Sequence, residues 1–272
     1  MTVDVPIIGQ GTWQIPENGN ARKTAVDALI RGSELGMVHI DTAEMYGNAE
    51  EVIAEALKIL EREKLFIVSK VLPSNASYPS TISALEKTLK RLNTDYLDCY
   101  LLHWRGNIAL SDTMAAFEKL ESDGKIRSFG VSNFDVDDLE EAIECLTTGK
   151  LACNQVLYNL AVRGIERNLI PFCQKNSISL VGYTPFGHLP SQNSKEGAIL
   201  KKIAEKHKAT PRQVILRFLT RLDNTFTIPK ASNPRHVEEN AGAAKFDLDV
   251  EDIESLDEVF PAPDKDVPLK ML

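Results

Sequence analysis

The sequence has no surplus of basic residues. Its 31 Lys and Arg are outnumbered by 39 Asp and Glu, which gives a net charge of -8 at pH 7. Nucleic acids and anionic membrane surfaces bind clustered Lys and Arg, so this balance argues against both as partners. Any anionic ligand must therefore find local positive charge. No apolar run approaches the roughly 20 residues that span a bilayer, so we expect no membrane segment.

Cysteine is scarce, and its spacing suggests no metal site. The four cysteines are Cys99, Cys145, Cys153 and Cys173, and they lie among apolar residues without a C-x-x-C pair. We interpret them as reduced core residues and expect no bound metal. The first residues, 1–6, lack the basic and apolar parts of a secretory signal. These features predict a cytoplasmic location.

The chain also lacks the Gly-x-Gly-x-x-Gly turn of a Rossmann domain, since its only candidate, Gly9-Gln10-Gly11, is too short. Short apolar runs instead alternate with segments of helical period, which is typical of βαβ units. We expect strands at residues 7–13, 38–40, 65–70, 96–104, 126–132, 152–158, 179–184 and 225–230. We expect helices at residues 21–35, 50–60, 80–92, 113–121, 135–146, 165–175, 197–208, 211–222, 234–244 and 250–260.

Polar residues recur at the ends of these strands, about 30 residues apart, with one longer final step. They are Thr12, Asp41, Lys70, His103, Ser132, Gln155, Tyr183 and Lys230. This recurrence fits a (β/α)8 TIM barrel, which takes roughly 250 residues. No linker-like change of composition interrupts the chain. We therefore predict one barrel domain over residues 1–272 with extra helices near the C-terminus, and a doubly wound parallel sheet remains an alternative.

The carboxyl ends of barrel strands meet at one mouth, so Asp41, Lys70 and His103 should converge there with Tyr46 from a loop. Taken singly, each has an ordinary interpretation as a cap, a strand end or a loop aromatic. Together they suit proton delivery to a carbonyl oxygen. A Lys ammonium lowers the pKa of a nearby phenol, an Asp holds that Lys, and a His orients the carbonyl. Lys70 alone would also fit a Schiff-base lyase.

A series of motifs follows in order along the chain. They are Gly11-Thr12-Trp13, His39-Ile40-Asp41-Thr42-Ala43, Tyr46-Gly47-Asn48, Lys70, Leu102-His103-Trp104, Gly130-Val131-Ser132-Asn133-Phe134, Asn154-Gln155-Val156 and Ile228-Pro229-Lys230. As a set they resemble the aldo-keto reductases. The resemblance implies a TIM barrel that reduces aldehyde and ketone carbonyls with NADPH bound in an extended pose. It also implies a catalytic tetrad of Asp41, Tyr46, Lys70 and His103, with Tyr46 as the general acid in reduction.

The resemblance assigns a cofactor site as well. Ser132, Asn133 and Gln155 match residues that hold the nicotinamide carboxamide, and Tyr183 matches the aromatic that stacks on the ring. Residues 184–189 match the loop that wraps the pyrophosphate, where backbone N–H groups serve the anion. The full set implied is Thr12, Trp13, Asp41, Ser132, Asn133, Gln155, Tyr183, Thr184, Phe186, Gly187, Leu189, Lys230, Ala231, Ser232, His236, Glu239 and Asn240.

The segment matched to the adenosine 2′-phosphate departs from the family pattern. Ala231 stands where a hydroxyl residue is common, and His236 where an arginine is common, with Arg235 one place early. Use of NADH besides NADPH is therefore conceivable. The segment 155–160, Gln-Val-Leu-Tyr-Asn-Leu, resembles bacterial-type reductases, some of which act on methylglyoxal and other small aldehydes.

Aromatic residues near the strand ends predict the substrate pocket. The expected contacts to a small carbonyl compound are Trp13, Tyr46, His103 and Trp104, with Met45 and the neighbours of Phe66 at the rim. The resemblance implies a monomer. Besides the lyase, a barrel that binds NADPH as a regulatory subunit without turnover remains an alternative.

Overall fold

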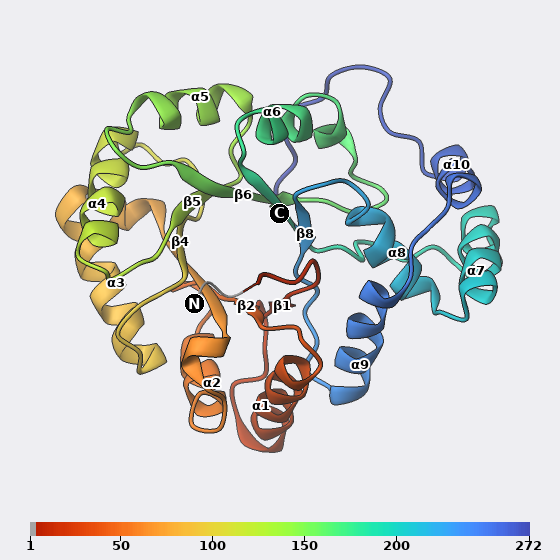
Figure 1. The fold of residues 1–272 in the computed structure, drawn as a ribbon, viewed down its shortest axis with the longest axis horizontal. Coiled ribbons are helices and arrows are strands. Elements are labelled where there is room, and N and C mark those ends of the chain that lie inside the picture. Colours follow the sequence, from red (N-terminus) through yellow and green to blue (C-terminus); the bar gives the residue numbers. More distant parts are fainter. Residues whose placement is uncertain (1–3) are drawn as a thin grey trace.

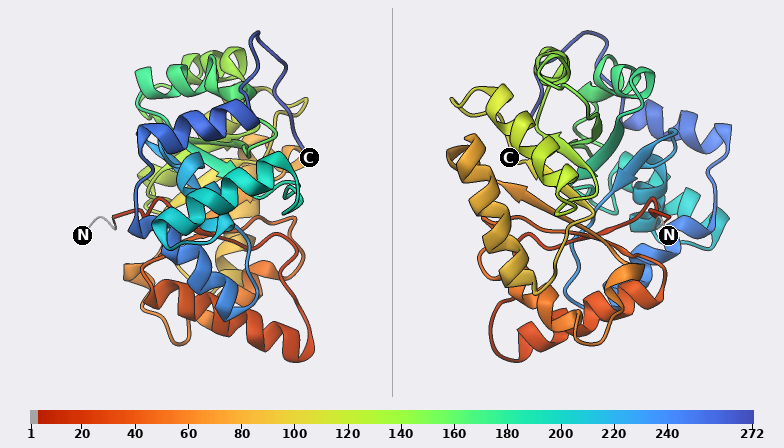
Figure 2. Two further views of the ribbon diagram at one scale, coloured as in Figure 1. Left: turned by 90° about the vertical axis from the view of Figure 1, so that its right-hand side faces the viewer. Right: turned by 60° about the vertical axis from the view of Figure 1, so that its left-hand side comes forward.

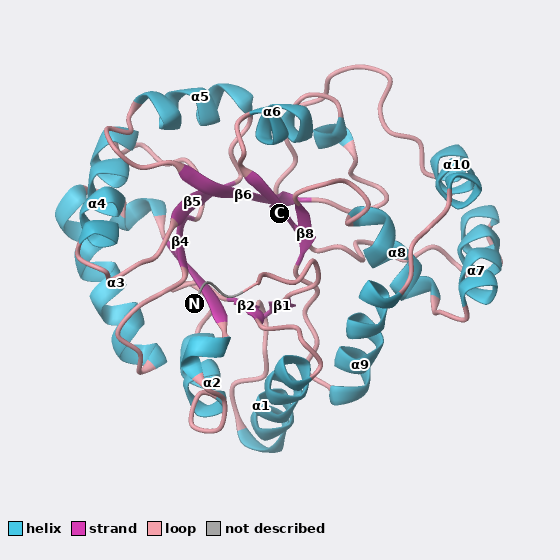
Figure 3. Cartoon of the chain, viewed as in Figure 1, coloured by secondary structure: helices cyan, strands magenta, loops and turns pink. Residues whose placement is uncertain are grey.

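A computed structural model describes residues 4–272, so residues 1–3 of the N-terminal stretch lie outside the description. Within it, eight parallel strands stand side by side in sequence order. They are β1 (Gln10–Gly11), β2 (His39–Asp41), β3 (Phe66–Val71), β4 (Cys99–Leu102), β5 (Phe129–Ser132), β6 (Leu151–Leu157), β7 (Ser179–Tyr183) and β8 (Thr225–Thr227). The strands form a central ring with the helices outside it (Figures 1 and 3). The fold is the (β/α)8 barrel that the spacing of strand ends predicted.

Helices connect the strands around the ring. They are α1 (Gly19–Glu34), α2 (Ala49–Ala56), α3 (Tyr78–Leu92), α4 (Leu110–Ser122), α5 (Val136–Glu144), α6 (Leu169–Lys175), α7 (Lys195–His207), α8 (Pro211–Leu219), α9 (Pro234–Gly242) and α10 (Val250–Val259), with 3₁₀ turns η1 (Arg62–Lys64), η2 (Pro73–Asn75), η3 (Gly164–Glu166) and η4 (Ala243–Lys245). Two helices separate β7 from β8, so the extra helices fall near the C-terminus as expected. No helix in the described part of the chain is both long and apolar enough to cross a bilayer.

The ring closes between β8 and the segment that contains β1. Ile8 forms an isolated parallel bridge with Thr227. Gly11 forms another with Lys230. A Cβ atom on Gly11 would lie 2.6 Å from the carbonyl oxygen of Ile228, so this close approach of two backbones requires glycine.

Several elements are shorter than the apolar runs that predicted them. The run 96–104 contains a strand only at Cys99–Leu102, and the run 225–230 leaves the ladder after Thr227, where Pro229 has no N–H to donate. The expected helix 165–175 is divided into η3 and α6, and the helix expected at 50–60 ends at Ala56. An apolar run indicates that its residues are buried, but it does not show where the strand ends. Leu97 and Ile228, for example, are buried although they lie outside β4 and β8.

Helix starts follow the sequence signals more closely. The Thr210 hydroxyl accepts the N–H of Gln213, and Pro211 is the first residue of α8, where the expected helix 211–222 begins. Asp135 caps α5 through the N–H of Asp138. Side chains at the caps act within one turn, so they can be recognised without knowledge of the tertiary fold.

The cysteines are free thiols, and three of them lie in the core. Cys99 and Cys153 face one another inside the barrel with their sulfur atoms 4.0 Å apart. Cys145 is only half-buried at the end of α5, so the expectation that all four are core residues is wrong for it. Its position at a helix end leaves one side open to solvent.

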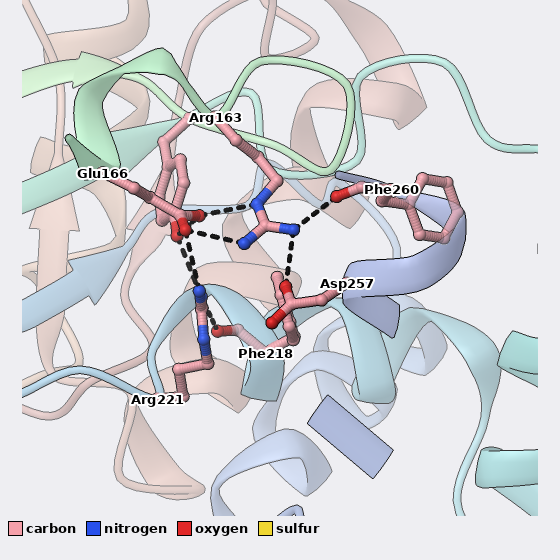
Figure 4. Close-up of polar contacts among 7 residues, drawn as sticks. Arg163, Glu166, Phe218, Arg221, Asp257 and Phe260 are labelled. Atoms are coloured by element: carbon pink, nitrogen blue, oxygen red, sulfur yellow. Dashed lines mark hydrogen bonds and ion pairs between the residues drawn. The ribbon is translucent and has the colours of Figure 1, made fainter. Parts of the chain in front are cut away.

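An ion-pair cluster around the buried Arg163 fastens the last helix to the barrel. Arg163 bonds Glu166 at 2.7 Å and Asp257 of α10 at 2.7 Å, and it also donates to the carbonyl of Phe260. Arg221 bonds the same Glu166 at 2.9 Å. Figure 4 shows Arg163 between these partners. The cluster therefore fixes the point at which the C-terminal tail leaves α10.

The tail, the Pro-rich segment 261–272, contains no helix or strand. It rises along the outside of the barrel and turns back toward it (Figure 2). Its end lies over the ring of strands beside β6 and β8 (Figure 1). The tail thus connects the cluster around Arg163 with the barrel mouth.

Candidate active site

A pocket of about 470 Å³ opens at the carboxyl ends of the strands. Residues from strand ends and the loops after them line it: Gly11, Thr12, Trp13, Gln14, Asp41, Met45, Tyr46, His103, Trp104, Ser132, Asn133, Gln155, Tyr183, Thr184, Pro185, Phe186, Gly187, Ile228, Lys230 and Leu272. Seven of the eight predicted strand-end residues are among them, all except Lys70. Parallel strands in a closed ring place these residues together although they are far apart in the sequence.

Lys70 lies beneath the pocket floor in a buried ion pair. Its Nζ atom donates to Oδ1 of Asp41 at 2.6 Å and to the carbonyl of Thr42 at 2.8 Å. Burial is the largest single influence and lowers the pKa of Lys70, but Asp41 and Tyr46 together outweigh it, so the pKa is raised overall. Lys70 is therefore an ammonium ion that is fixed in place by its hydrogen bonds to Asp41 and Thr42.

Gln155 and Thr12 complete the environment of the Asp41 side chain and backbone. The Gln155 Nε2 atom donates to Oδ2 of Asp41 at 2.7 Å, and the Thr12 hydroxyl donates to the Asp41 carbonyl at 2.9 Å. Each carboxylate oxygen of Asp41 thus has its own donor. The Gln155 contact was not anticipated, because the sequence matched this amide only to the nicotinamide.

Tyr46 lies above Lys70, whose Nζ atom is 5.0 Å from the centre of its ring. The loop that follows β2 carries it into the pocket. Burial raises the pKa of the Tyr46 phenol, while the charge of Lys70 acts in the opposite direction. The expected lowering by the lysine is present, but it does not prevail and the pKa is raised overall.

His103 follows β4 and faces Tyr46, with the two ring centres 5.6 Å apart in an edge-to-face arrangement. Burial, together with the charge of Lys70, lowers the pKa of His103 to about 3. The imidazole is therefore neutral at neutral pH. Its Nδ1 atom is buried and has no hydrogen-bond partner among residues 4–272.

One side of the pocket carries a chain of polar groups from three strand ends. The Tyr183 hydroxyl donates to the Asn133 side-chain oxygen at 2.9 Å, and the Asn133 amide donates to the carbonyl of His103 at 3.1 Å. Ser132 donates to the carbonyl of Gln155 at 2.8 Å. Asn133 has a φ of 61°, a left-handed conformation that asparagine tolerates and that turns its amide toward the pocket. These residues meet as the sequence predicted.

The other predicted cofactor residues divide into two groups. Thr12, Trp13, Thr184, Phe186, Gly187 and Lys230 line the pocket. The residues that do not line it lie in the loop after β7, in the segment before α9 or in α9 itself: Leu189, Ala231, Ser232, His236, Glu239 and Asn240. Lys230 joins the two regions, since its Nζ atom lies 3.2 Å from the Ser232 hydroxyl oxygen.

The substrate-side predictions are mostly placed at the pocket, with one correction. Trp13, Met45 and Trp104 line it. Phe66 is the first residue of β3, at the opposite end of the barrel, where it contacts His39, so its neighbours do not form the rim. The mouth lies at the Lys70 end of the run 65–70, so Phe66, near the start of the run, belongs to the opposite end. The sequence also missed Leu272, which only the path of the tail brings to the pocket.

Comparisons with known proteins agree with this geometry. The profile of the aldo/keto reductase family matches residues 7–260. Methylglyoxal reductase YeaE of Escherichia coli is 45% identical over 275 residues, covering 99% of this chain and 96% of that protein. Glyoxal reductase of Bacillus subtilis is 38% identical over 270 residues, covering 97% and 94%.

Solved structures are similar throughout the chain. An aldo/keto reductase from Klebsiella pneumoniae, crystallised with NADP and acetate, superposes with a TM-score of 0.92 at 42% identity. The match covers 98% of this chain and 96% of that one. The chain therefore belongs to the aldo/keto reductase family.

Proposed function

We propose that this protein reduces aldehyde and ketone carbonyls to alcohols with NADPH. The observation that carries the proposal is the position of Tyr46 and His103 in the pocket above the buried Lys70–Asp41 pair. A phenol and an imidazole facing one open space can both reach one carbonyl oxygen. The names and cofactors of the similar reductases support the same reaction.

Tyr46 is the proton donor in this proposal. Its raised pKa keeps the phenol protonated at neutral pH, which is the form that reduction needs. As the carbonyl oxygen takes the proton, negative charge passes to the phenolate, and the ammonium of Lys70 is placed to stabilise it. Asp41 positions Lys70 and keeps it charged.

His103 orients the carbonyl. A neutral imidazole donates a hydrogen bond without competing as an acid, and the low pKa of His103 keeps it neutral. The alternative role of imidazolium proton donor would require a pH near 3. Tyr46 therefore transfers the proton, and His103 positions the carbonyl group.

The residues present fit a nicotinamide dinucleotide. Two side-chain amides, Asn133 and Gln155, and the ring of Tyr183 line one side of the pocket, and Lys230 lines it at the edge toward α9. Amide groups can bind a carboxamide, an aromatic ring can stack on nicotinamide, and a lysine can pair with phosphate. Bound NADPH would supply the hydride. The chain's own groups bind it, exclude water and deliver the proton.

We propose small aldehydes and dicarbonyl compounds as substrates, the class named for two relatives. The pocket walls support it, because Trp13 and Met45 are exposed at its mouth and offer apolar surface without a fixed charge. The oxygen atom of a second carbonyl group can accept a hydrogen bond from Tyr46 or His103.

Two alternatives from the sequence are less well supported. A Schiff-base lyase needs Lys70 as a free amine in contact with substrate, yet its Nζ atom is paired with Asp41 and its pKa is raised. A regulatory barrel without turnover would have no use for a phenol above a buried ammonium. We further propose a monomer of one domain over residues 1–272 in the cytoplasm, in line with the free cysteines and the closed barrel. Sedimentation at assay concentration tests the monomer.

The deciding experiment follows NADPH and NADH absorbance against a panel of aldehydes, ketones and dicarbonyls. Tyr46→Phe should lose about 10²- to 10⁴-fold in kcat, the usual contribution of a general acid, and keep its affinity for NADPH. Turnover equal to wild type in this variant would refute the proposal. Borohydride trapping of an adduct at Lys70 would favour the lyase instead.

A further inference from the structure

Arg212 is a half-buried arginine that does not itself line the pocket. It is the second residue of α8, and its guanidinium carbon lies 4.6 Å from the centre of the Phe186 ring. Within residues 4–272 no carboxylate forms an ion pair with it. By contrast, a carboxylate pairs with Arg31 of α1, with Arg217 of α8 and with Arg221, which follows α8.

Phe186 places this guanidinium at the cofactor groove. Phe186 lines the pocket and also packs against a small core cluster that includes Leu216 of α8 and Val237 of α9. The ring thus lies between the pocket and the junction of α8 with α9. A guanidinium that stacks on an aromatic ring still has its N–H groups directed outward, in the plane of the guanidinium.

The start of α8 also contacts the segment matched to the 2′-phosphate. Gln213, next to Arg212, donates from its side chain to the carbonyl of Glu239 at 2.8 Å. α8 and α9 lie side by side at this edge of the barrel (Figure 1). Lys230 and Ser232 precede α9 on the same edge. Arg212 and Lys230 therefore flank the same end of the groove.

The charge at this end needs a second cation. The protein carries a net charge of -8, so a dianionic phosphate must be met by local positive charge. Lys230 supplies one charge, and the family position that often supplies another is His236 here. Arg212 reaches the same end from a different helix, and its fork of donors suits phosphate oxygens.

We infer that Arg212 binds the 2′-phosphate of NADPH, together with Lys230, and so sets the preference for NADPH over NADH. This inference rests on the proposed function, because it assumes that the groove binds a nicotinamide dinucleotide. It explains how a chain with Ala231 and His236 keeps a phosphate site. Phe186 acts as the support that orients the guanidinium.

The test uses fragments of the cofactor, so it does not depend on turnover. Calorimetry measures the dissociation constants of 2′,5′-ADP and 5′-ADP for the wild type, Arg212→Gln, Arg212→Lys and the control Lys202→Gln. Lys202 is an exposed residue of α7, so the control removes the same charge elsewhere. Thermal melting confirms that each variant is folded.

The wild type should bind 2′,5′-ADP more tightly than 5′-ADP, and Arg212→Gln should reduce that preference about tenfold or more, the usual weight of a charge-assisted bond. Arg212→Lys should lose less, and Lys202→Gln should match the wild type. An unchanged ratio in Arg212→Gln, an equal weakening of both ligands, or a loss in Arg212→Lys as large as in Arg212→Gln would overturn the inference. A wild type that binds neither fragment and leaves NADPH unoxidised would instead refute the proposed function.

Discussion

Lys70 and Asp41 form an ion pair of 2.6 Å in which neither side chain is more than 2% exposed. The second oxygen of Asp41 accepts from Gln155, so each oxygen of the carboxylate has its own donor. A pair this deeply buried is stable only while both members are present, because either charge alone would lack water. The pair links the stability of the barrel to the chemistry above it.

Asp41→Asn should therefore reduce both stability and activity. The variant leaves the Lys70 ammonium buried without a counter-charge, which costs about 3 to 5 kcal/mol of the free energy of unfolding. Urea unfolding checks the stability, and kcat with a small aldehyde checks the activity. The double variant Asp41→Asn/Lys70→Met should recover part of the stability and none of the activity. Full stability in Asp41→Asn would contradict the pairing.

The pH dependence of reduction separates the two possible proton donors. Burial raises the pKa of Tyr46, so the phenol stays protonated and kcat for reduction should be constant from about pH 5 to about pH 9. A donor at His103, with its pKa of about 3, would make the rate fall steadily with pH over this range. Stopped-flow measurement of hydride transfer distinguishes the two, and oxidation of the alcohol should accelerate as the pH rises.

His39 predicts a loss of stability in acid. Burial lowers the pKa of this imidazole from 6.5 to about 4, and neither ring nitrogen has a partner among residues 4–272. Between these values the unfolded chain binds the proton and the folded chain does not, so stability falls as the pH drops from about 6.5 to about 4 and the loss then ends. The expected loss is about 3 kcal/mol.

Denaturation by urea across this pH range measures that slope. His39→Leu should reduce the slope by about half, because leucine cannot be protonated while His103, whose pKa is also lowered, still contributes. The exposed His188→Leu should leave the slope as in the wild type. Equal slopes in His39→Leu and the wild type would show that the acid sensitivity arises elsewhere.

Arg163→Met tests the cluster that fastens the C-terminal tail. Arg163 is buried, and its removal deprives Asp257 and the Phe260 carbonyl of a donor while Glu166 keeps Arg221, so the variant should lose about 1 to 3 kcal/mol of stability. The tail after Phe260 reaches the pocket at Leu272, so KM for the carbonyl substrate should rise more than kcat falls.

Arg167→Met is the matched control for that variant. Arg167 pairs with Asp266 of the tail at 2.7 Å, but both side chains are exposed, so its removal should cost about 0 to 1 kcal/mol. Thermal melting and limited proteolysis of the tail compare the two variants. If Arg167→Met released the tail as readily as Arg163→Met, the buried cluster would not be what holds it.

The barrel and most of its mouth were predictable from sequence because both depend on periodic, local signals. Short apolar runs mark strands, and a polar residue after each run marks the strand's exit from the core, as at Asp41 and His103. The ends of the elements were less predictable. Apolar residues beside β4 and β8 are buried although they lie outside these strands, so their hydrophobicity alone does not reveal where a strand begins or ends.

Contacts between distant side chains were beyond the sequence. Gln155 meets Asp41 across 114 positions, and Arg212 meets Phe186 between two elements whose packing no periodicity describes. The direction in which the pKa of Tyr46 shifts could not be predicted from the sequence either. The sequence identified the lysine that lowers the phenol pKa, but the burial that raises it is a property of the assembled pocket.

By itself, then, the sequence determined the (β/α)8 topology, the family resemblance and the four residues Asp41, Tyr46, Lys70 and His103, because residue type and order along the chain carry that information. The tertiary structure alone decided which groups are buried, which charges are paired and where Arg212 lies relative to the groove. Burial and pairing depend on the distances between side chains, and those distances are set only when the strands close into a barrel.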